Sequence, residues 1–248
     1  GICYKQLGRY DDAVVAFRKA VALNPTCSEA YCGLGIALCM TGEFFAGARA
    51  FEQVITLKPQ YTEAYYNLGI TYNTIEEYYD AIRVLHRLVS IRPDFIEAYC
   101  ELSLAYVSIG AYDNALAILK QAQDRDPDNA HIQYGMGIAY TNLMQHDEAI
   151  TVLASVATRE PGWAQAHFLL GVNYGCLGKH RDEIDAYTKA IHFKPDFADA
   201  YFNLAVTYAA RGDRKVAIDQ YTSLKRIDPE RAAHLLQIIE SVDQQEEQ

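Results

Sequence analysis

The chain has 248 residues, of which 50% are hydrophobic and 22% are charged, so it is expected to fold around an apolar core. Its formal net charge is −10, with 32 acidic residues against 22 basic ones, which argues against binding to a nucleic acid. No apolar run approaches the roughly 18 residues that cross a bilayer, so membrane insertion is not expected. The first residues also lack the basic and apolar regions of a signal peptide.

All seven prolines obey one period, because each lies 34 residues after the one before it. They are Pro25, Pro59, Pro93, Pro127, Pro161, Pro195 and Pro229. A period between about 20 and 50 residues indicates an array of structural repeats. Counting each unit from the third residue after a proline gives a partial unit followed by complete ones. The predicted units are 1–27 (partial), 28–61, 62–95, 96–129, 130–163, 164–197 and 198–231.

Each unit begins with the pattern of an amphipathic helix. Apolar residues recur at the fourth, seventh, eighth and eleventh positions, which lie on one face of a helix. The seventh position reads Leu34, Leu68, Leu102, Met136, Leu170 and Leu204. The eighth is small throughout and reads Gly35, Gly69, Ser103, Gly137, Gly171 and Ala205. Small residues there predict close approach of a second helix.

A glycine column then predicts the end of this first helix, because glycine can adopt a positive φ. The column contains Gly8, Gly42, Gly110, Gly178 and Gly212. A second helical pattern follows and ends at the proline, which cannot continue a helix and moves the residue before it out of the α region. Its twentieth position is small except for Glu183, whose head we expect to reach water because an unpaired buried carboxylate is costly. Replacement of Glu183 by Ala is therefore expected to stabilise the chain.

These residues resemble the tetratricopeptide repeat family. The segments YCGLGIAL, YYNLGITY and YFNLAVTY match the first part of the family pattern, and AIRVL, ALAIL and AIDQY match the second. The resemblance covers residues 1–231, with Gln133 and His167 as tolerated departures at the fourth position. It implies an all-α fold, a right-handed α-α superhelix (solenoid) of stacked helix-turn-helix units. In this fold the first helices line a concave groove and the second helices form the outer wall.

Both ends of the chain depart from complete units. Gly1 falls at the eighth position of the partial unit, so we expect the native protein to extend further upstream. Beyond the last unit, residues 232–248 are predicted to form a C-terminal capping helix followed by a frayed polar tail. The apolar residues of the cap are Leu235, Ile238, Ile239 and Val242, again at the fourth, seventh, eighth and eleventh positions.

The sequence shows no constellation of catalytic residues. It has no GxSxG, GxxxxGK[ST] or HExxH motif, and its seven histidines are scattered over different positions of the repeat. The six cysteines form no CxxC pair and no metal-ligand spacing, which favours small apolar thiols in a reducing cytoplasm over disulfides or a metal site. We therefore expect a cytoplasmic protein that is not an enzyme and needs no cofactor or metal.

The expected groove combines an aliphatic stripe at the ninth position with aromatic residues at the fifth and several asparagines. Its residues are Ile36, Tyr66, Asn67, Ile70, Asn73, Leu104, Tyr134, Ile138, Asn142, Phe168, Val172, Phe202, Asn203 and Val206. Acids at the second position form its rim, namely Glu29, Glu63, Glu97 and Asp199. Two alternatives stay open. The stripe could serve packing between neighbouring helices alone, and the acids could complement helix dipoles.

The leading hypothesis is a protein-protein interaction scaffold whose apolar, acid-rimmed groove binds a partner peptide or helix. The partner is expected to be apolar, or amphipathic with a basic face. One alternative is a structural module that self-associates. Another is a substrate-recruiting array of a larger enzyme whose catalytic domain lies outside this chain.

Overall fold

The computed structural model describes residues 1–246, and within that range it contains fifteen helices and no strand. The all-α class expected from the sequence is therefore confirmed. The helices fall into two compact units, the first over Gly1–Pro127 and the second from Asp128 onward. No helix within the described range is both long enough and apolar enough to cross a membrane.

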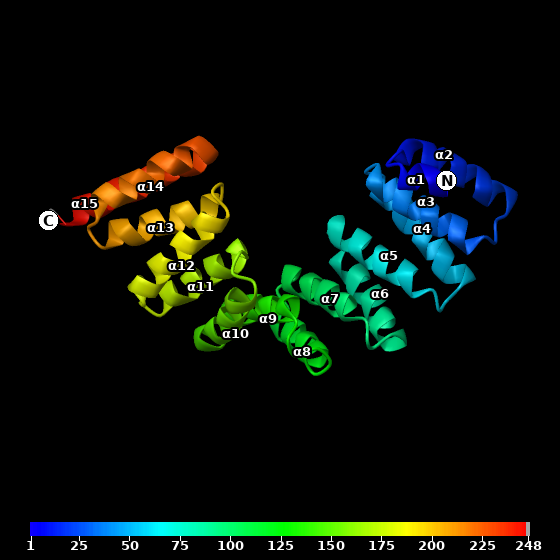
Figure 1. Ribbon diagram of the computed structural model, residues 1–248, viewed down its shortest axis with the longest axis horizontal. Coiled ribbons are helices and arrows are strands. Elements are labelled where there is room, and N and C mark those ends of the chain that lie inside the picture. The colour runs from blue at the N-terminus through cyan, green and yellow to red at the C-terminus, as the bar shows by residue number, and fades with distance from the viewer. Residues whose placement is uncertain (247–248) are drawn as a thin grey trace. The chain divides into compact units, whose positions relative to one another are not determined.

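Unit 1 and unit 2 each consist of consecutive helices (Figure 1). Unit 1 contains α1 (Ile2–Gln6), α2 (Tyr10–Leu23), α3 (Ser28–Met40), α4 (Phe44–Leu57), α5 (Thr62–Thr74), α6 (Tyr78–Ile91), α7 (Ile96–Ser108) and α8 (Tyr112–Gln123). Unit 2 contains α9 (Ala130–Asn142), α10 (His146–Arg159), α11 (Ala164–Cys176), α12 (His180–Phe193), α13 (Ala198–Ala210), α14 (Arg214–Ile227) and α15 (Pro229–Glu246).

Within each unit the helices pack as a stack of hairpins. In unit 1, α3 packs on α4, α5 on α6 and α7 on α8, and each hairpin also packs on the next. The first helices of successive hairpins contact one another, α3 with α5 and α5 with α7, whereas no contact of similar extent joins α4 with α6 in the part described. The side of the first helices is called the inner face, and that of the second helices the outer face. Each unit has its own inner and outer face.

The turn inside each hairpin requires a residue with positive φ. Gly8, Gly42, Gly110, Gly178 and Gly212 have φ between 67° and 86°, as the glycine column predicts. The column is interrupted by Glu76 in unit 1 and Met144 in unit 2, and these two residues adopt the same conformation with φ of 63° and 58°. Side chains with a Cβ are strained in this region of backbone space. The strain shows that the hairpin packing determines the turn.

The prolines follow the ends of the second helices, as expected. The last residues of α2, α4, α6, α10, α12 and α14 each lie two positions before a proline. Lys58, which precedes Pro59, has φ −136° and ψ 86°, outside the α region. The exception is α8, which ends at Gln123, four positions before Pro127. At the last proline a new helix begins at once, because proline is favourable at the first helical position and Asp228 Oδ1 accepts from the backbone N–H of Arg231.

Two of the four tyrosines at the fourth position make a hydrogen bond to the loop before their helix. The hydroxyls of Tyr65 and Tyr99 donate to the carbonyl oxygens of Pro59 and Pro93, each at 3.2 Å. His167 keeps the same bond, since its Nε2 lies 2.9 Å from the carbonyl oxygen of Pro161. The departure at His167 therefore preserves the contact that joins one hairpin to the next.

Small and large residues are complementary in the core. A Cβ on Gly69 would lie 2.5 Å from Leu85 Cδ2, and one on Gly171 would lie 2.5 Å from Tyr187 Cε1. Real Cβ atoms do not approach other atoms so closely, so the small eighth position is required by the large residue on the second helix. This pairing holds the two helices of a hairpin together.

The head of Glu183 does not reach water, contrary to the expectation from the sequence. Its side chain is only 10% exposed. Thr207 Oγ1 donates to Glu183 Oε1 at 2.7 Å, and His180 Nδ1 lies 3.0 Å from Oε2. Gly175 leaves the necessary space, because a Cβ there would lie 2.7 Å from Oε1. The carboxylate is thus buried but hydrogen-bonded, which removes the reason for expecting Glu183→Ala to stabilise the chain.

The last helix, α15, packs on α13 and α14. Leu235 and Ile239 are almost fully buried in a cluster that also contains Ala205 and Leu224. The helix continues to Glu246, so it includes most of the segment that the sequence predicts to be a polar tail. The tail's last two residues, 247–248, lie outside the described residues.

Candidate functional site

The aliphatic stripe of the ninth position lies on the inner face of each unit. In unit 1, Ile36 and Ile70 are partly buried, and Leu104 is 50% exposed. In unit 2 the stripe consists of Ile138, Val172 and Val206, all partly buried. The stripe therefore leaves apolar surface accessible in both units, and Leu104 is the most exposed of these six side chains.

The aromatic residues of the fifth position are half-buried and pack on the next hairpin. The ring centroids of Tyr66 and Phe95 are 4.9 Å apart, and those of Phe168 and Phe197 are 5.0 Å apart. Tyr134 stacks on Trp163 at 4.6 Å, and Phe202 lies 5.7 Å from His234. Such aromatic pairs stabilise the boundary between hairpins by about 0.5–1.5 kcal/mol each.

The partners of these rings were missed in the sequence. Most occupy the thirty-fourth position of the repeat, which reads Tyr61, Phe95, Asn129, Trp163, Phe197 and Arg231 in the complete units. The recurrence of aromatic residues in this column is the feature of the sequence that could have predicted these contacts. The fifth position is therefore committed in part to packing between hairpins.

The four asparagines already donate hydrogen bonds within the chain. Asn67 and Asn142 donate to carbonyl oxygens one turn earlier in their own helices, at 2.8 and 2.9 Å. Asn203 donates to the hydroxyl of Tyr187 at 3.3 Å. Asn73 on α5 donates to the backbone oxygen and Oε2 of Glu101 on α7, at 3.1 and 3.0 Å. Binding of a ligand backbone by Asn67, Asn142 or Asn203 would thus use their oxygens or exchange existing bonds, whereas the Oδ1 of Asn73 is buried.

The four acids of the predicted rim fall into two pairs with different surroundings. Glu29 accepts from Lys58 Nζ at 2.5 Å, and this ion pair lowers the pKa of the Glu29 carboxyl to about 2. Asp199 lies 2.5 Å from Arg231 Nη1. Glu63 and Glu97 are exposed, and neither forms an ion pair with any residue in the range 1–246. Two of the four acids are therefore available to a basic ligand.

A further acid, Glu101, completes an acidic patch on unit 1 that consists of Glu63, Glu97 and Glu101. Burial, followed by the charges of Glu101 and Glu97, raises the pKa of Tyr66 on the neighbouring helix. The same causes in the same order raise the pKa of the Cys100 thiol to about 11. The hydrogen bond from Asn73 places Glu101 beside α5, and Glu97 lies about one helical turn before it on α7. The sequence could have indicated Glu101, because it is an acid at the sixth position, where the other complete units have Gly, Asn or Leu.

The inner face of unit 2 lacks this acidity. His131 and Gln165 occupy the second position of its first two repeats, and the acid of the third, Asp199, is already paired with Arg231. The sixth position there contains Gly135, Leu169 and Asn203. Of the four predicted rim acids, the two that form no ion pair, Glu63 and Glu97, therefore both lie on unit 1.

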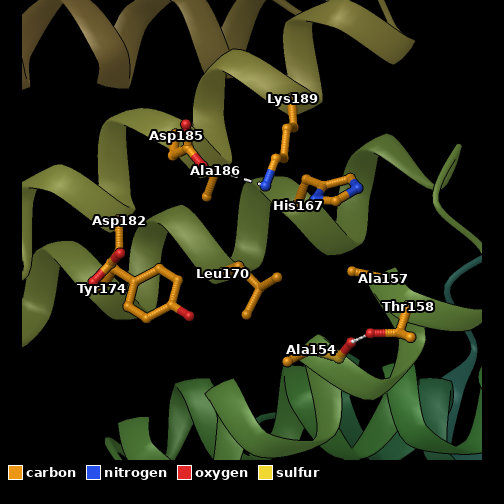
Figure 2. A pocket seen from close by; sticks show the side chains of 10 residues that line it. All are labelled: Ala154, Ala157, Thr158, His167, Leu170, Tyr174, Asp182, Asp185, Ala186 and Lys189. Carbon is orange, nitrogen blue, oxygen red and sulfur yellow. Dashed lines mark hydrogen bonds and ion pairs between the residues drawn. The ribbon is translucent and has the colours of Figure 1, made fainter.

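The outer face of each unit carries a cavity that the sequence did not indicate. In unit 2 a cavity of about 310 Å³ lies between α10 and α12, and residues of α11 also line it. It is called the outer groove of unit 2. Figure 2 shows its lining, with Leu170 between the small residues of α10 and the charged residues of α12. The lining residues are Ala154, Ala157, Thr158, His167, Leu170, Tyr174, Asp182, Asp185, Ala186 and Lys189.

The outer groove of unit 1 occupies the same place in the repeat, between α4 and α6 above α5, with a volume of about 520 Å³. Bulkier apolar residues and two arginines line it. The lining residues are Glu52, Ile55, Thr56, Tyr65, Leu68, Arg83, Val84 and Arg87. In neither unit do three or more His, Cys, Asp or Glu residues of the described range gather as metal ligands, and all six cysteines are free thiols.

Comparisons with known proteins agree with this architecture. Models described as tetratricopeptide repeat match residues 62–95, 108–171 and 186–215, and one described as TPR repeat matches 2–42. No curated protein matches the chain.

Several solved structures of repeat proteins are similar. A tetratricopeptide repeat protein from Parabacteroides merdae ATCC 43184 is 14% identical, with a TM-score of 0.76 over 96% of this chain and 95% of that one. The MamA protein is 26% identical, with a TM-score of 0.62 over 68% and 92% of the two chains. YrrB, described as a TPR protein with an unusual peptide-binding site, is 23% identical, with a TM-score of 0.61 over 76% and 97%.

Proposed function

The chain is a tetratricopeptide repeat protein and hence a protein-interaction scaffold, and we propose that it binds its partner along the inner face of unit 1. The observation that supports this assignment is the acidic patch of Glu63, Glu97 and Glu101, which forms no ion pair within residues 1–246 and shares α5 and α7 with the aliphatic residues Ile70 and Leu104. The partner is an extended segment or an amphipathic helix with a basic face, and the role involves no catalysis.

Charge selectivity follows from which acids are already paired. A Lys or Arg of the partner gains an ion pair at Glu63 or Glu97 without breaking one inside the chain. At Glu29 or Asp199 it would have to displace Lys58 or Arg231. Complementary charges of this kind mainly set the rate and specificity of association. Burial of apolar surface then adds affinity, at about 25 cal/mol per Å² before the costs of association.

The decisive experiment reverses the charge of the patch. We expect the double variant Glu63→Lys/Glu97→Lys to lose partner capture from a lysate of the source organism, because a basic ligand would now be repelled. The matched control, Glu76→Lys/Glu77→Lys, makes the same charge change on exposed residues at the turn of the hairpin that contains Glu63. Equal capture by the two double variants would refute the proposal.

Aromatic substitutions would give a less clear answer. Tyr66, Phe168 and Phe202 pack on residues of the next hairpin, so their replacement by Ala lowers stability as well as any binding. Leu104→Asp is the better apolar test, because this side chain is half exposed and can change without opening the core. Sedimentation of the wild-type chain alone would reveal self-association, which the capture experiment does not measure.

A further inference from the structure

One end of the outer groove of unit 1 holds charged side chains that already make hydrogen bonds within the chain. Glu52 Oε1 accepts from the hydroxyl of Tyr72 at 2.7 Å, and Arg83 Nη2 donates to Asp80 Oδ1 at 2.6 Å. Burial and the hydrogen bond to Glu52 raise the pKa of Tyr72, so its hydroxyl stays protonated and keeps donating. At this end of the groove, near the turn between α5 and α6, Arg83 is already paired with Asp80 and Glu52 keeps its negative charge, so a carboxylate ligand is not favoured there.

The other end presents a single cation. Arg87 lines the groove and is exposed, and within residues 1–246 its guanidinium group makes no hydrogen bond and no ion pair. The apolar side chains that line the groove with it are the partly exposed Ile55 and the buried Tyr65 and Val84. An unpaired guanidinium group next to apolar surface is suited to a carboxylate that follows an apolar side chain, because arginine binds carboxylates through two parallel hydrogen bonds.

The outer groove of unit 2 provides an internal contrast at the same repeat positions. Lys189 stands where unit 1 has Arg87, but its Nζ lies 3.3 Å from Asp185 Oδ2, the ion pair drawn in Figure 2. Ala157 and Ala186 replace the larger Ile55 and Val84. This groove therefore offers neither the unpaired cation nor the same apolar contact.

We propose that the outer groove of unit 1 is a second docking site, for a segment of a partner protein in which an apolar side chain is followed by a carboxylate. The apolar side chain contacts Ile55, Tyr65 and Val84, and the carboxylate binds Arg87. The site lies on the opposite face from the acidic patch and selects the opposite charge. It is independent of the function proposed above, so either can fail without the other.

Binding of short synthetic peptides tests this site. One peptide array carries a central Leu-Glu pair in otherwise neutral sequence, and a second array carries Leu-Lys instead. Binding of the strongest Leu-Glu peptide to the full chain is then measured by fluorescence anisotropy. Arg87→Glu is expected to weaken binding at least about tenfold, equivalent to about 1.4 kcal/mol, and Arg87→Gln to weaken it less. Ile55→Ala is expected to weaken it as well.

Two controls separate this site from other surfaces. Lys189→Glu makes the same charge change in the outer groove of unit 2, and Glu63→Lys/Glu97→Lys changes the inner face of unit 1. Both should leave the affinity for the Leu-Glu peptide within about twofold. The proposal is overturned if no Leu-Glu peptide binds, if Leu-Lys peptides bind equally well, or if Lys189→Glu weakens binding as much as Arg87→Glu.

Discussion

The two units share one backbone plan but differ in the chemistry of their hairpin boundaries. At the seventeenth position, unit 1 has Tyr10, Phe44, Tyr78 and Tyr112, whereas unit 2 has His146, His180 and Arg214. His146 Nδ1 lies 2.9 Å from Oδ1 of the fully buried Asn173, which in turn donates to Thr141 Oγ1 at 2.8 Å. His180 likewise contacts the buried Glu183. The fold thus accepts buried polar groups where neighbouring hairpins supply their partners.

The largest expected effect comes from placing a carboxylate in unit 1 at the position that Glu183 occupies in unit 2. That residue is Ala81, which is fully buried. In unit 1 the positions of Gly175, His180 and Thr207 hold larger or apolar residues, so the new charge lacks both space and partners. We expect Ala81→Glu to cost about 3–5 kcal/mol in the free energy of unfolding, measured by urea denaturation.

A rebuilt boundary is the control for that variant. Ala105→Thr introduces the hydroxyl group and Asn73→Gly the space, at the unit 1 equivalents of Thr207 and Gly175. Adding both to Ala81→Glu should recover part of the lost stability. A loss below about 1 kcal/mol for Ala81→Glu alone would show that the partners of the carboxylate are unimportant.

The next largest effects on stability are expected at the polar boundary around Glu183 in unit 2. Glu183→Ala should now destabilise the chain by about 1–2 kcal/mol, because it removes two hydrogen bonds and leaves a cavity. Gly175→Ala should cost about 1–3 kcal/mol, since its Cβ would meet the carboxylate. The double variant should lose less than the sum, because the new methyl group fills the vacated space. Additive losses in thermal unfolding would contradict this coupling.

A smaller gain in stability is expected at the two strained turns, one in each unit. Glu76→Gly and Met144→Gly should each stabilise the chain by about 0.5–1 kcal/mol, because glycine adopts positive φ without strain. Gly110→Ala, at φ 73°, is the reverse control and should destabilise unit 1. A gain at only one turn would show that the units differ in backbone strain as well as in boundary chemistry.

The smallest expected effect is a dependence on pH that belongs to unit 1. Burial lowers the pKa of His86, whose Nε2 contacts the hydroxyl of Tyr106 at 2.6 Å. The folded chain then binds this proton less readily than the unfolded chain. The contribution of His86 is present above the ordinary pKa of about 6.5 and is lost as pH falls through the lower pKa of the folded state.

Unfolding free energies measured on both sides of that range check this expectation. His86→Gln should reduce the loss of stability on acidification. Thr188 stands at the same repeat position in unit 2 and has no titratable group, so it adds no pH dependence to the free energy of unfolding. Identical pH profiles of the wild-type chain and His86→Gln would contradict the assignment.

The sequence was sufficient for the helices because their signals are local and repeated. The proline and glycine columns indicate where helices end, and the small eighth position indicates where they approach one another. These features depend on neighbours within one hairpin, such as Gly69 and Leu85. Glu76 and Met144 were the turns without this signal, because the surrounding packing imposes a conformation that their own preference does not predict.

The site was less predictable because its properties depend on residues about one repeat apart. Glu29 is paired with Lys58 and Asp199 with Arg231, contacts that a helical pattern cannot reveal. The ring of Tyr66 packs on Phe95, a loop residue whose contact with it the helical pattern does not predict. The outer grooves depend on side-chain volumes contributed by three different helices.

The hydrogen bond from the fourth position to a proline carbonyl has a consequence for how such a chain can change in length. The bond between Tyr65 and Pro59 spans only six positions, from the loop that joins two hairpins to the first turn of α5. Duplication or deletion of a whole 34-residue block therefore preserves this six-position spacing at the junctions that remain. An insertion of any other size between these residues would separate donor from acceptor. Gene recombination can thus vary the number of repeats without new mutations at the junctions.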